Sequence, residues 1–193
     1  MALRLHHWNA AVAGSLMPTI YIAEVVIRNF AMRRLIAHIR KHWYRDPRLE
    51  QKLGRSQLKN SLRTTVQALL DAERVGNLAD DVTSELTFGF WVNVFTRTFV
   101  PMLWVRPLDT INASIPRGLA ITELHDGVEF VRGFRNNVAH HKNLVCTPPP
   151  DNFDRTLKVL GWICKSSAQV SRDFAQFPAV WQCSPVPHER LRP

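Results

Sequence analysis

The sequence contains few cysteines, and their spacing supports neither a disulfide framework nor a zinc site. Three cysteines, Cys146, Cys164 and Cys183, are spread over 193 residues without a CxxC pair. An odd number of widely spaced cysteines is typical of reduced thiols in a cytosolic protein. Since 46% of the residues are hydrophobic, we expect a cytoplasmic protein held together by an apolar core.

The motifs of several large enzyme classes are also missing. The sequence has no P-loop, no GxGxxG, no HExxH and no GxSxG. These absences weaken interpretations as an NTPase, a dehydrogenase, a metalloprotease or a serine hydrolase. We therefore expect no cofactor and no metal.

Acidic residues are scarce relative to basic ones. There are 16 Asp and Glu against 25 Lys and Arg, which gives a formal net charge of +9. Such a balance favours a polyanionic partner, either nucleic acid or an anionic membrane surface, without deciding between them.

A long uninterrupted hydrophobic run is lacking as well. The uncharged stretch "AAVAGSLMPTIYIA", residues 10–23, contains Pro18 and continues into Glu24 and Arg28 at helical spacing. It is shorter than the roughly 20 residues that a membrane-spanning helix needs. We interpret it as a buried helix, not a signal peptide or a membrane anchor.

The apolar periodicity predicts an all-α fold: a single-domain bundle of five to six helices over residues 1–183, with a flexible tail over 184–193. No segment has the pattern of a strand set. We expect helices over residues 3–14, 18–43, 56–75, 119–142 and 153–174, and one through Phe88, Trp91, Val92 and Phe95 capped by Thr83 or Ser84.

Polar residues gather in "RGFRNNVAHHKNLV", residues 132–145. On a helix, Arg132, Asn136 and His140 share one polar stripe, and Arg135 flanks the core side. Histidine carries protons near neutral pH, and arginine binds phosphate oxygens. Such a group suits proton transfer beside a phosphate, and RNA supplies its own nucleophile in the 2′-hydroxyl.

The spacing of arginine and histidine is not specific by itself. Arg33 and His38 also have four residues between them. A solvated helix face therefore remains the alternative for the polar stretch, and the adjacent Asn136 and the doubled His140–His141 distinguish it.

Three motifs in order resemble the Abi-like (abortive infection) branch of the HEPN superfamily. They are "AEVVIRN" with Glu24, Arg28 and Asn29, "FGFW" over residues 88–91, and "FRNNVAHH", which matches the R-x4-6-H motif. The resemblance covers residues from about 8 to 165. It implies an all-α domain with metal-independent ribonuclease chemistry at a site shared across a dimer, although some superfamily members bind RNA without cutting it.

The resemblance assigns roles to the polar stretch. His140 would be the general acid and base, Arg135 would stabilise charge on the phosphate, and Asn136 would orient His140 or the phosphate. Arg132 and His141 would support them.

Further residues are candidates for support or for binding. Glu24, Arg28 and Asn29 either brace the site or, in the case of Glu24 and Arg28, form a half-buried ion pair along one helix. Residues of the basic run "MRRLIAHIRKHW" are candidate RNA backbone contacts: Arg33, Arg34, Arg40 and Lys41. His38 and His42 have metal-binding spacing but no third ligand, so no metal is expected.

The resulting hypothesis is a cytoplasmic, metal-independent endoribonuclease acting in abortive infection or toxin–antitoxin defence. The alternative is a non-catalytic RNA-binding or protein-interaction module. RNA is the expected partner, an antitoxin protein is a further candidate, and no membrane is expected. One His140 cannot serve both the 2′-oxygen and the leaving 5′-oxygen, so we expect a homodimer with Arg132, Asn136 and His140 at its interface.

Overall fold

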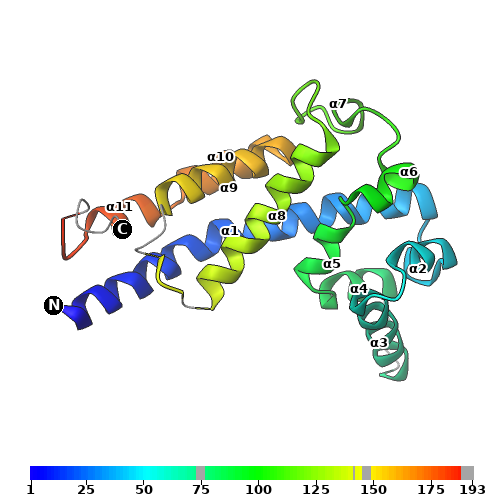
Figure 1. Ribbon diagram of the computed structural model, residues 1–193, viewed down its shortest axis with the longest axis horizontal. Helices are drawn as coiled ribbons and strands as arrows, with labels where there is room; N and C mark the ends of the chain where they lie inside the picture. The colour runs from blue at the N-terminus through cyan, green and yellow to red at the C-terminus, as the bar shows by residue number, and fades with distance from the viewer. Residues whose placement is uncertain (73–76, 141, 145–148, 188–193) are drawn as a thin grey trace.

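The structure, a computed structural model, describes residues 1–72, 77–140, 142–144 and 149–187. Within this part the chain forms eleven α-helices and two 3-10 helices and contains no strand (Figure 1). The all-α prediction is confirmed, but the predicted number of five or six helices is wrong. In chain order the elements are α1 (Ala2–Ile39), η1 (Trp43–Arg45), α2 (Pro47–Leu53), α3 (Gln57–Asp71), α4 (Leu78–Glu85), α5 (Phe88–Asn93), η2 (Arg97–Phe99), α6 (Val100–Leu103), α7 (Leu108–Ile111), α8 (Ile121–Ala139), α9 (Pro149–Ile163), α10 (Lys165–Asp173) and α11 (Phe177–Gln182).

The first helix, α1, is continuous over 38 residues, where we expected two helices meeting at Pro18. Proline inside a helix removes one backbone hydrogen bond and crowds the carbonyl four residues earlier, at a cost of roughly 3 kcal/mol. Leu16 and Ile20, on either side of Pro18, are both buried. Burying one such side chain contributes about 1.5–3 kcal/mol, which offsets the proline and keeps the helix intact.

This helix passes through two hydrophobic clusters. The N-terminal cluster gathers the first half of α1 with α8, α9 and α11; its buried members are Trp8, Val12, Ala13, Leu16, Ile20, Phe134, Val138, Leu144, Phe153, Leu157 and Phe177. The aromatic cluster gathers the second half of α1 with α4, α5 and α6. The predicted apolar stripe of this helix is confirmed, since all of its members are buried: Ile20, Ala23, Ile27, Ala31 and Leu35.

In the N-terminal cluster, α11 lies alongside the beginning of α1 (Figure 1). The Trp8 and Trp181 rings pack with centroids 4.9 Å apart, and Trp8 Nε1 donates a hydrogen bond to the Val180 carbonyl at 2.9 Å. Val186, just after α11, also packs against this cluster.

In the aromatic cluster, the "FGFW" segment begins α5. Phe90 and Trp91 are fully buried, and Trp91 packs edge-on against Trp43 with centroids 5.5 Å apart. A helix that is apolar nearly all round is expected in the core, and the burial of Phe90 and Trp91 confirms this. The predicted cap is wrong, because Thr83 and Ser84 lie inside the separate helix α4, where their hydroxyls donate to backbone carbonyls of that helix.

The α2–α3 end of the molecule lies farthest from α11 (Figure 1). Helix α3 starts after Ser56, as predicted, but the Ser56 hydroxyl donates to the Leu53 carbonyl at 2.6 Å and does not cap the helix. Leu62 and Leu69 are buried as expected, whereas Leu70, expected to point inward, is 41% exposed.

The predicted last helix, residues 153–174, is divided. It forms α9 and α10, separated at Cys164, whose backbone is extended with φ −150°. Helices α8 and α9 approach closely at Gly127, where a Cβ atom would lie 2.8 Å from the Trp162 ring. Helices α1, α8 and α9 thus pack against one another.

By length and composition, α1 is able to cross a membrane. Only 44% of its most apolar 18-residue window is buried in this fold. A buried core helix meets the same criteria, so the length of α1 does not decide between a membrane span and a core helix.

Candidate active site

Helix α8 carries the polar stretch and is anchored by one apolar face. The Glu123 carboxylate accepts the backbone N–H of Ala120 at 2.9 Å, which satisfies one free donor at the start of the helix. The predicted core stripe is buried, namely Val131, Phe134 and Val138. Beside this stripe, Arg132, Arg135 and Asn136 are half-buried, and Arg135 reaches α1.

Arg135 forms an ion pair with Glu24 of α1. Its Nε donates to Glu24 Oε2 at 3.3 Å, and the two side chains are 37% and 26% exposed. The partners are 111 residues apart in the chain. The structure thus joins the first and third of the three motifs at one point.

Asn136 also holds the Arg135 side chain in place. Arg135 Nη1 donates to Asn136 Oδ1 at 3.5 Å, a long hydrogen bond. A guanidinium has five N–H donors, so those not used by Glu24 and Asn136 remain for an anion such as a phosphate.

His140 stands at the C-terminal end of α8 as its capping residue, not inside the helix, and is exposed. Its backbone N–H donates to the Asn136 carbonyl at 3.0 Å. In the described part of the chain no hydrogen bond reaches its ring, so the expected bond from Asn136 to the ring is not formed. His141 lies outside the described residues.

The chain beyond His140 is tied to α1. The Leu144 backbone N–H donates to Asn9 Oδ1 at 2.9 Å, and the Leu144 side chain is buried in the N-terminal cluster. The Lys142 N–H donates to the Asn137 carbonyl at 3.0 Å. These contacts fix where His140 leaves the helix. The sequence analysis missed Asn9, because nothing local marks its partner 135 residues away.

Of the two alternatives for Glu24 and Arg28, the ion pair along α1 is not formed, because the Glu24 carboxylate turns to Arg135. Arg28 Nε is buried, with no hydrogen-bond partner among the described residues. The residue as a whole is half-buried, one helical turn from Glu24. Asn29 is half-buried next to Arg28 on α1.

Arg132 is held by Glu129, a residue that the sequence analysis also missed. Arg132 Nε donates to Glu129 Oε2 at 2.8 Å, and the ion pair links positions i and i+3. This hydrogen bond lowers the pKa of Glu129 and raises the pKa of Arg132 from their ordinary values. Both therefore stay charged at neutral pH.

The four residues expected to contact RNA do not form one solvated face. Arg33 and Lys41 are exposed, and Arg40 is the exposed capping residue of α1 with φ 82°, in the left-handed region. Arg34 instead turns inward, and its Nη2 donates to the Leu103 carbonyl at 2.6 Å.

His38 and His42 do not share a helix face, because α1 ends at Ile39. His38 Nε2 lies 2.6 Å from Arg34 Nη2, and His42 Nδ1 lies 3.2 Å from the Tyr44 hydroxyl. Burial, and then the Arg34 charge, lower the pKa of His38. Among the described residues no group of three His, Cys, Asp or Glu is placed to hold a metal ion.

No protein-family model, no curated protein and no solved structure matches this chain.

Proposed function

We propose that the protein is a metal-independent endoribonuclease of HEPN type, acting in abortive infection or toxin–antitoxin defence in the cytoplasm. The observation that supports it best is the Glu24–Arg135 ion pair. It fixes an arginine that has donors left for a phosphate, and the helix that carries this arginine ends at the exposed His140. The resemblance in "AEVVIRN" and "FRNNVAHH" adds to this, since the pair links these two segments.

In this proposal Arg135 binds the scissile phosphate, with its orientation fixed by Glu24 and Asn136. His140 takes the proton from the 2′-hydroxyl or gives one to the leaving 5′-oxygen. Attack of the 2′-oxygen yields a 2′,3′-cyclic phosphate and a 5′-hydroxyl. The positive charge of the half-buried Arg28 adds to the attraction for RNA.

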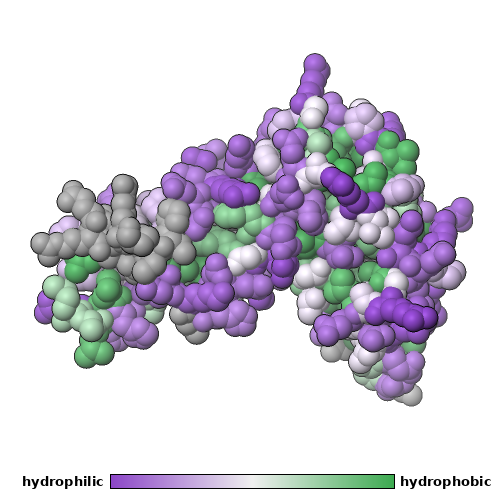
Figure 2. All heavy atoms as spheres, viewed as in Figure 1, coloured by the Kyte–Doolittle hydropathy of each residue, from purple (hydrophilic) through white to green (hydrophobic). Residues whose placement is uncertain are grey.

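The proposal includes a homodimer, in which two copies supply the base and the acid from their two His140 side chains. Exposed hydrophobic residues on α1 lie just before Glu24 and favour a covered surface there, namely Met17, Tyr21 and Ile22. More hydrophobic surface is visible at the N-terminal end of the same helix, where Met1 and Leu3 are exposed (Figure 2). A second copy of this chain is our proposed occupant, and an antitoxin would compete for the same surface.

The test is to incubate the purified protein with mixed cellular RNA, with and without EDTA, and to analyse the product ends. We expect cleavage that survives EDTA and leaves cyclic-phosphate ends. Cleavage that EDTA abolishes and Mg²⁺ restores would disprove the acid–base mechanism. RNA binding without cleavage would instead favour a non-catalytic RNA-binding module.

The shared site is tested by mixing two inactive variants, His140→Ala and Arg135→Ala. Co-refolded heterodimers should remain inactive, because they contain a single His140, whereas the proposed site needs one from each copy. Heterodimers of the parent with His140→Ala should lose activity for the same reason, and full activity in them would refute the shared site. A protein that light scattering shows to be monomeric while fully active would refute the dimer.

A further inference from the structure

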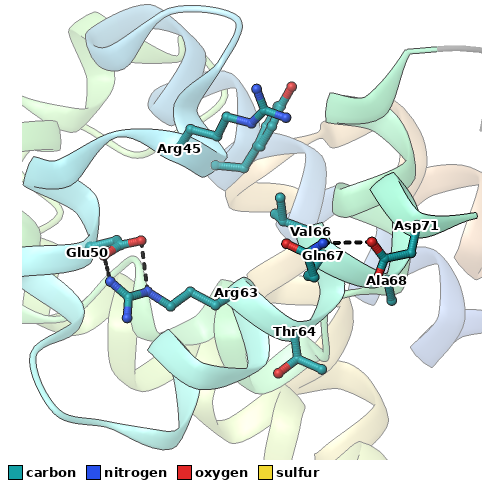
Figure 3. Close-up of a pocket in the computed structure, with 9 residues that line it drawn as sticks. Arg45, Glu50, Arg63, Thr64, Val66, Gln67, Ala68 and Asp71 are labelled. Carbon is teal, nitrogen blue, oxygen red and sulfur yellow. Dashed lines mark hydrogen bonds and ion pairs between the residues drawn. The ribbon is translucent and has the colours of Figure 1, made fainter. Parts of the chain in front are cut away.

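Three pockets in the described part of the chain differ in the charge of their linings. The pocket lined by η1 and α3 holds both signs, and there Arg63 is paired with Glu50 (Figure 3). A second pocket, between α8 and α9, is lined by four carboxylates and two cations. The third, which we name the basic pocket, lies between α1, the end of α7 and the start of α10. It is lined by Arg33, Arg34 and Lys165 and by no carboxylate.

The basic pocket has the dimensions of a small-ligand site. Its volume is about 880 Å³, within the usual range of roughly 300–1,000 Å³ for such sites. Phe30, Ile111 and Ile163 give it an apolar wall. It therefore offers cations on one side and hydrophobic surface on another.

Arg34 is fixed in this pocket before any ligand arrives. Its Nη2 and Nε both donate to the Leu103 carbonyl, at 2.6 and 3.2 Å, and its guanidinium lies 5.5 Å from the centre of the Trp104 ring. Burial, and then the positive charge of Arg106, lower the pKa of Arg34. An anion in the pocket would relieve this repulsion.

The other cations of the pocket have no counter-charge within the described part of the chain. Arg33 and Lys165 are exposed, and the ion pairs found there involve neither of them, nor Arg34. Four arginines outside the pocket are paired with carboxylates, namely Arg48, Arg63, Arg132 and Arg135. The basic pocket thus gathers three cations without an ion pair around one cavity.

The wall opposite α1 is rigid and polar. Asn112 Nδ2 donates to the Ile163 carbonyl at 2.7 Å, and its Oδ1 accepts the Ser114 N–H at 2.9 Å, which holds this loop against the end of α9. Cys164 and Ser166 complete the wall, with Sγ and Oγ 3.3 Å apart. The thiol of Cys164 is thus a built-in reporter of occupancy.

We propose that the basic pocket binds a small organic phosphate, whose phosphate oxygens contact Arg33 and Lys165 and whose apolar part lies against Phe30 and Ile111. Arg33 follows Glu24 by nine residues, which places it about 180° round α1. The two sites therefore face different sides of the helix. Binding in the pocket is independent of the proposed ribonuclease activity, and either can fail alone.

The test uses phenyl phosphate as the probe and Cys164 as the reporter. In the variant with Cys146→Ser and Cys183→Ser, the rate of Cys164 alkylation by iodoacetamide is followed by mass spectrometry. Saturating phenyl phosphate should slow alkylation about tenfold, as expected for an occupied site of this kind, while phenol at equal concentration should not. An unchanged rate, or protection by single-stranded RNA alone, would overturn the proposal.

Two variants and one control locate the binding. Arg33→Ala and Lys165→Ala each remove an exposed cation, so both should fold normally and weaken phenyl phosphate binding, measured by calorimetry, by about tenfold or more. Arg172→Ala removes an exposed cation of α10 that does not line the pocket and should bind as the parent does. Equal binding to all three variants would place the ligand elsewhere and refute the assignment.

Discussion

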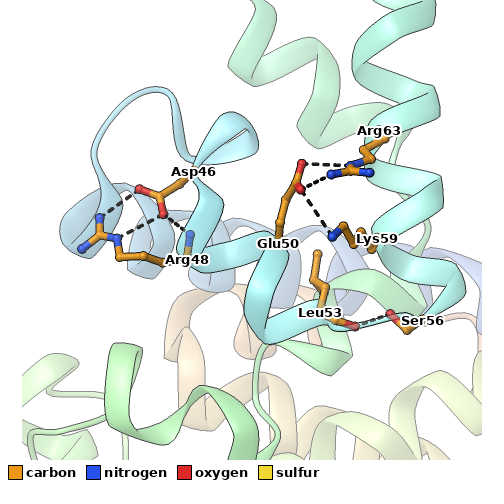
Figure 4. Close-up of polar contacts among 7 residues, drawn as sticks. All are labelled: Asp46, Arg48, Glu50, Leu53, Ser56, Lys59 and Arg63. Atoms are coloured by element: carbon orange, nitrogen blue, oxygen red, sulfur yellow. Dashed lines mark hydrogen bonds and ion pairs between the residues drawn. The ribbon is translucent and has the colours of Figure 1, made fainter.

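The α2–α3 end and the α1–α8 junction both pair arginines with carboxylates, but the partners are brought together differently. At the α2–α3 end, Arg63 Nε donates to Glu50 Oε1 at 3.1 Å, and Lys59 lies 3.5 Å from the same carboxylate (Figure 4). These partners are at most 13 residues apart. At the α1–α8 junction, Glu24 and Arg135 are 111 residues apart.

The difference shows that an ion pair alone does not mark a site. The α2–α3 network closes a local turn, and its carboxylates are occupied by neighbouring cations. The α1–α8 junction instead leaves donors of Arg135 unused and ends at the exposed His140. A pair becomes a candidate for chemistry when a proton carrier is exposed on the same helix, as His140 is at the end of α8.

The largest difference between the two regions is expected when the proton carrier is removed. His140→Ala should reduce RNA cleavage by about 10²–10⁴-fold, the usual contribution of general acid–base catalysis. Arg63→Ala, the matched change at the α2–α3 end, should leave cleavage unchanged. A gel-based rate assay measures both, and an active His140→Ala protein would move the site elsewhere.

A smaller effect on cleavage is expected when the Glu24–Arg135 ion pair is weakened. Glu24→Gln keeps the size of the side chain but removes the charge that holds Arg135, so cleavage should fall by about tenfold or more through loss of orientation. RNA affinity should change little, which separates positioning from binding. Glu50→Gln is the control, and an equal loss in both variants would mean a general effect on the fold.

At the α2–α3 end the expected effect is on stability alone. Asp46 caps α2, since its Oδ1 accepts the Arg48 backbone N–H at 2.8 Å. Asp46→Ala should lower the free energy of unfolding by about 1 kcal/mol, as measured by urea denaturation. Arg48→Ala retains the cap and should cost less. A loss of RNA cleavage in Asp46→Ala would show that the two regions are coupled.

The smallest effect concerns pH. Hydrogen bonds from Arg63 and Arg132 lower the pKa values of Glu50 and Glu129 from their ordinary values. A carboxylate with a lowered pKa in the folded state stabilises the protein above its unfolded pKa, about 4.3 for glutamate, and the contribution is lost as the pH falls through the folded pKa. The difference in urea midpoint between the parent and Arg132→Ala should therefore shrink from pH 7 to pH 3. A difference that persists in acid would assign it to packing.

The sequence predicts those parts of the site that lie on one helix. Helical periodicity separates the core stripe from Arg132, Arg135 and Asn136, and the structure confirms that separation. The partner of Glu24 is not predictable this way, because local spacing points to Arg28, whereas the actual partner depends on how two distant helices cross.

The division of the last predicted helix has a similar cause. The glycine near the break, Gly161, lies inside α9 and not at Cys164. Asn112, from a loop 51 residues earlier, donates to the Ile163 carbonyl at the end of α9. A long-range contact thus ends the helix where the local sequence does not, and the same holds for the Asn9 contact that positions the chain after His140.

Because α1 passes through two hydrophobic clusters, its two halves are expected to unfold locally with different free energies. The N-terminal cluster includes residues of this helix up to Ile20, and the aromatic cluster begins at Ala23, with Pro18 close to the boundary. Units with separate cores open with separate free energies, which amide hydrogen exchange reports. Amides of α11 and of the first half of α1 should exchange as one group, faster than those near the aromatic cluster. Glu24 lies just past the boundary between the two clusters. Local unfolding of the N-terminal cluster would therefore release the end of α8 from Phe134 onward and leave the aromatic cluster folded.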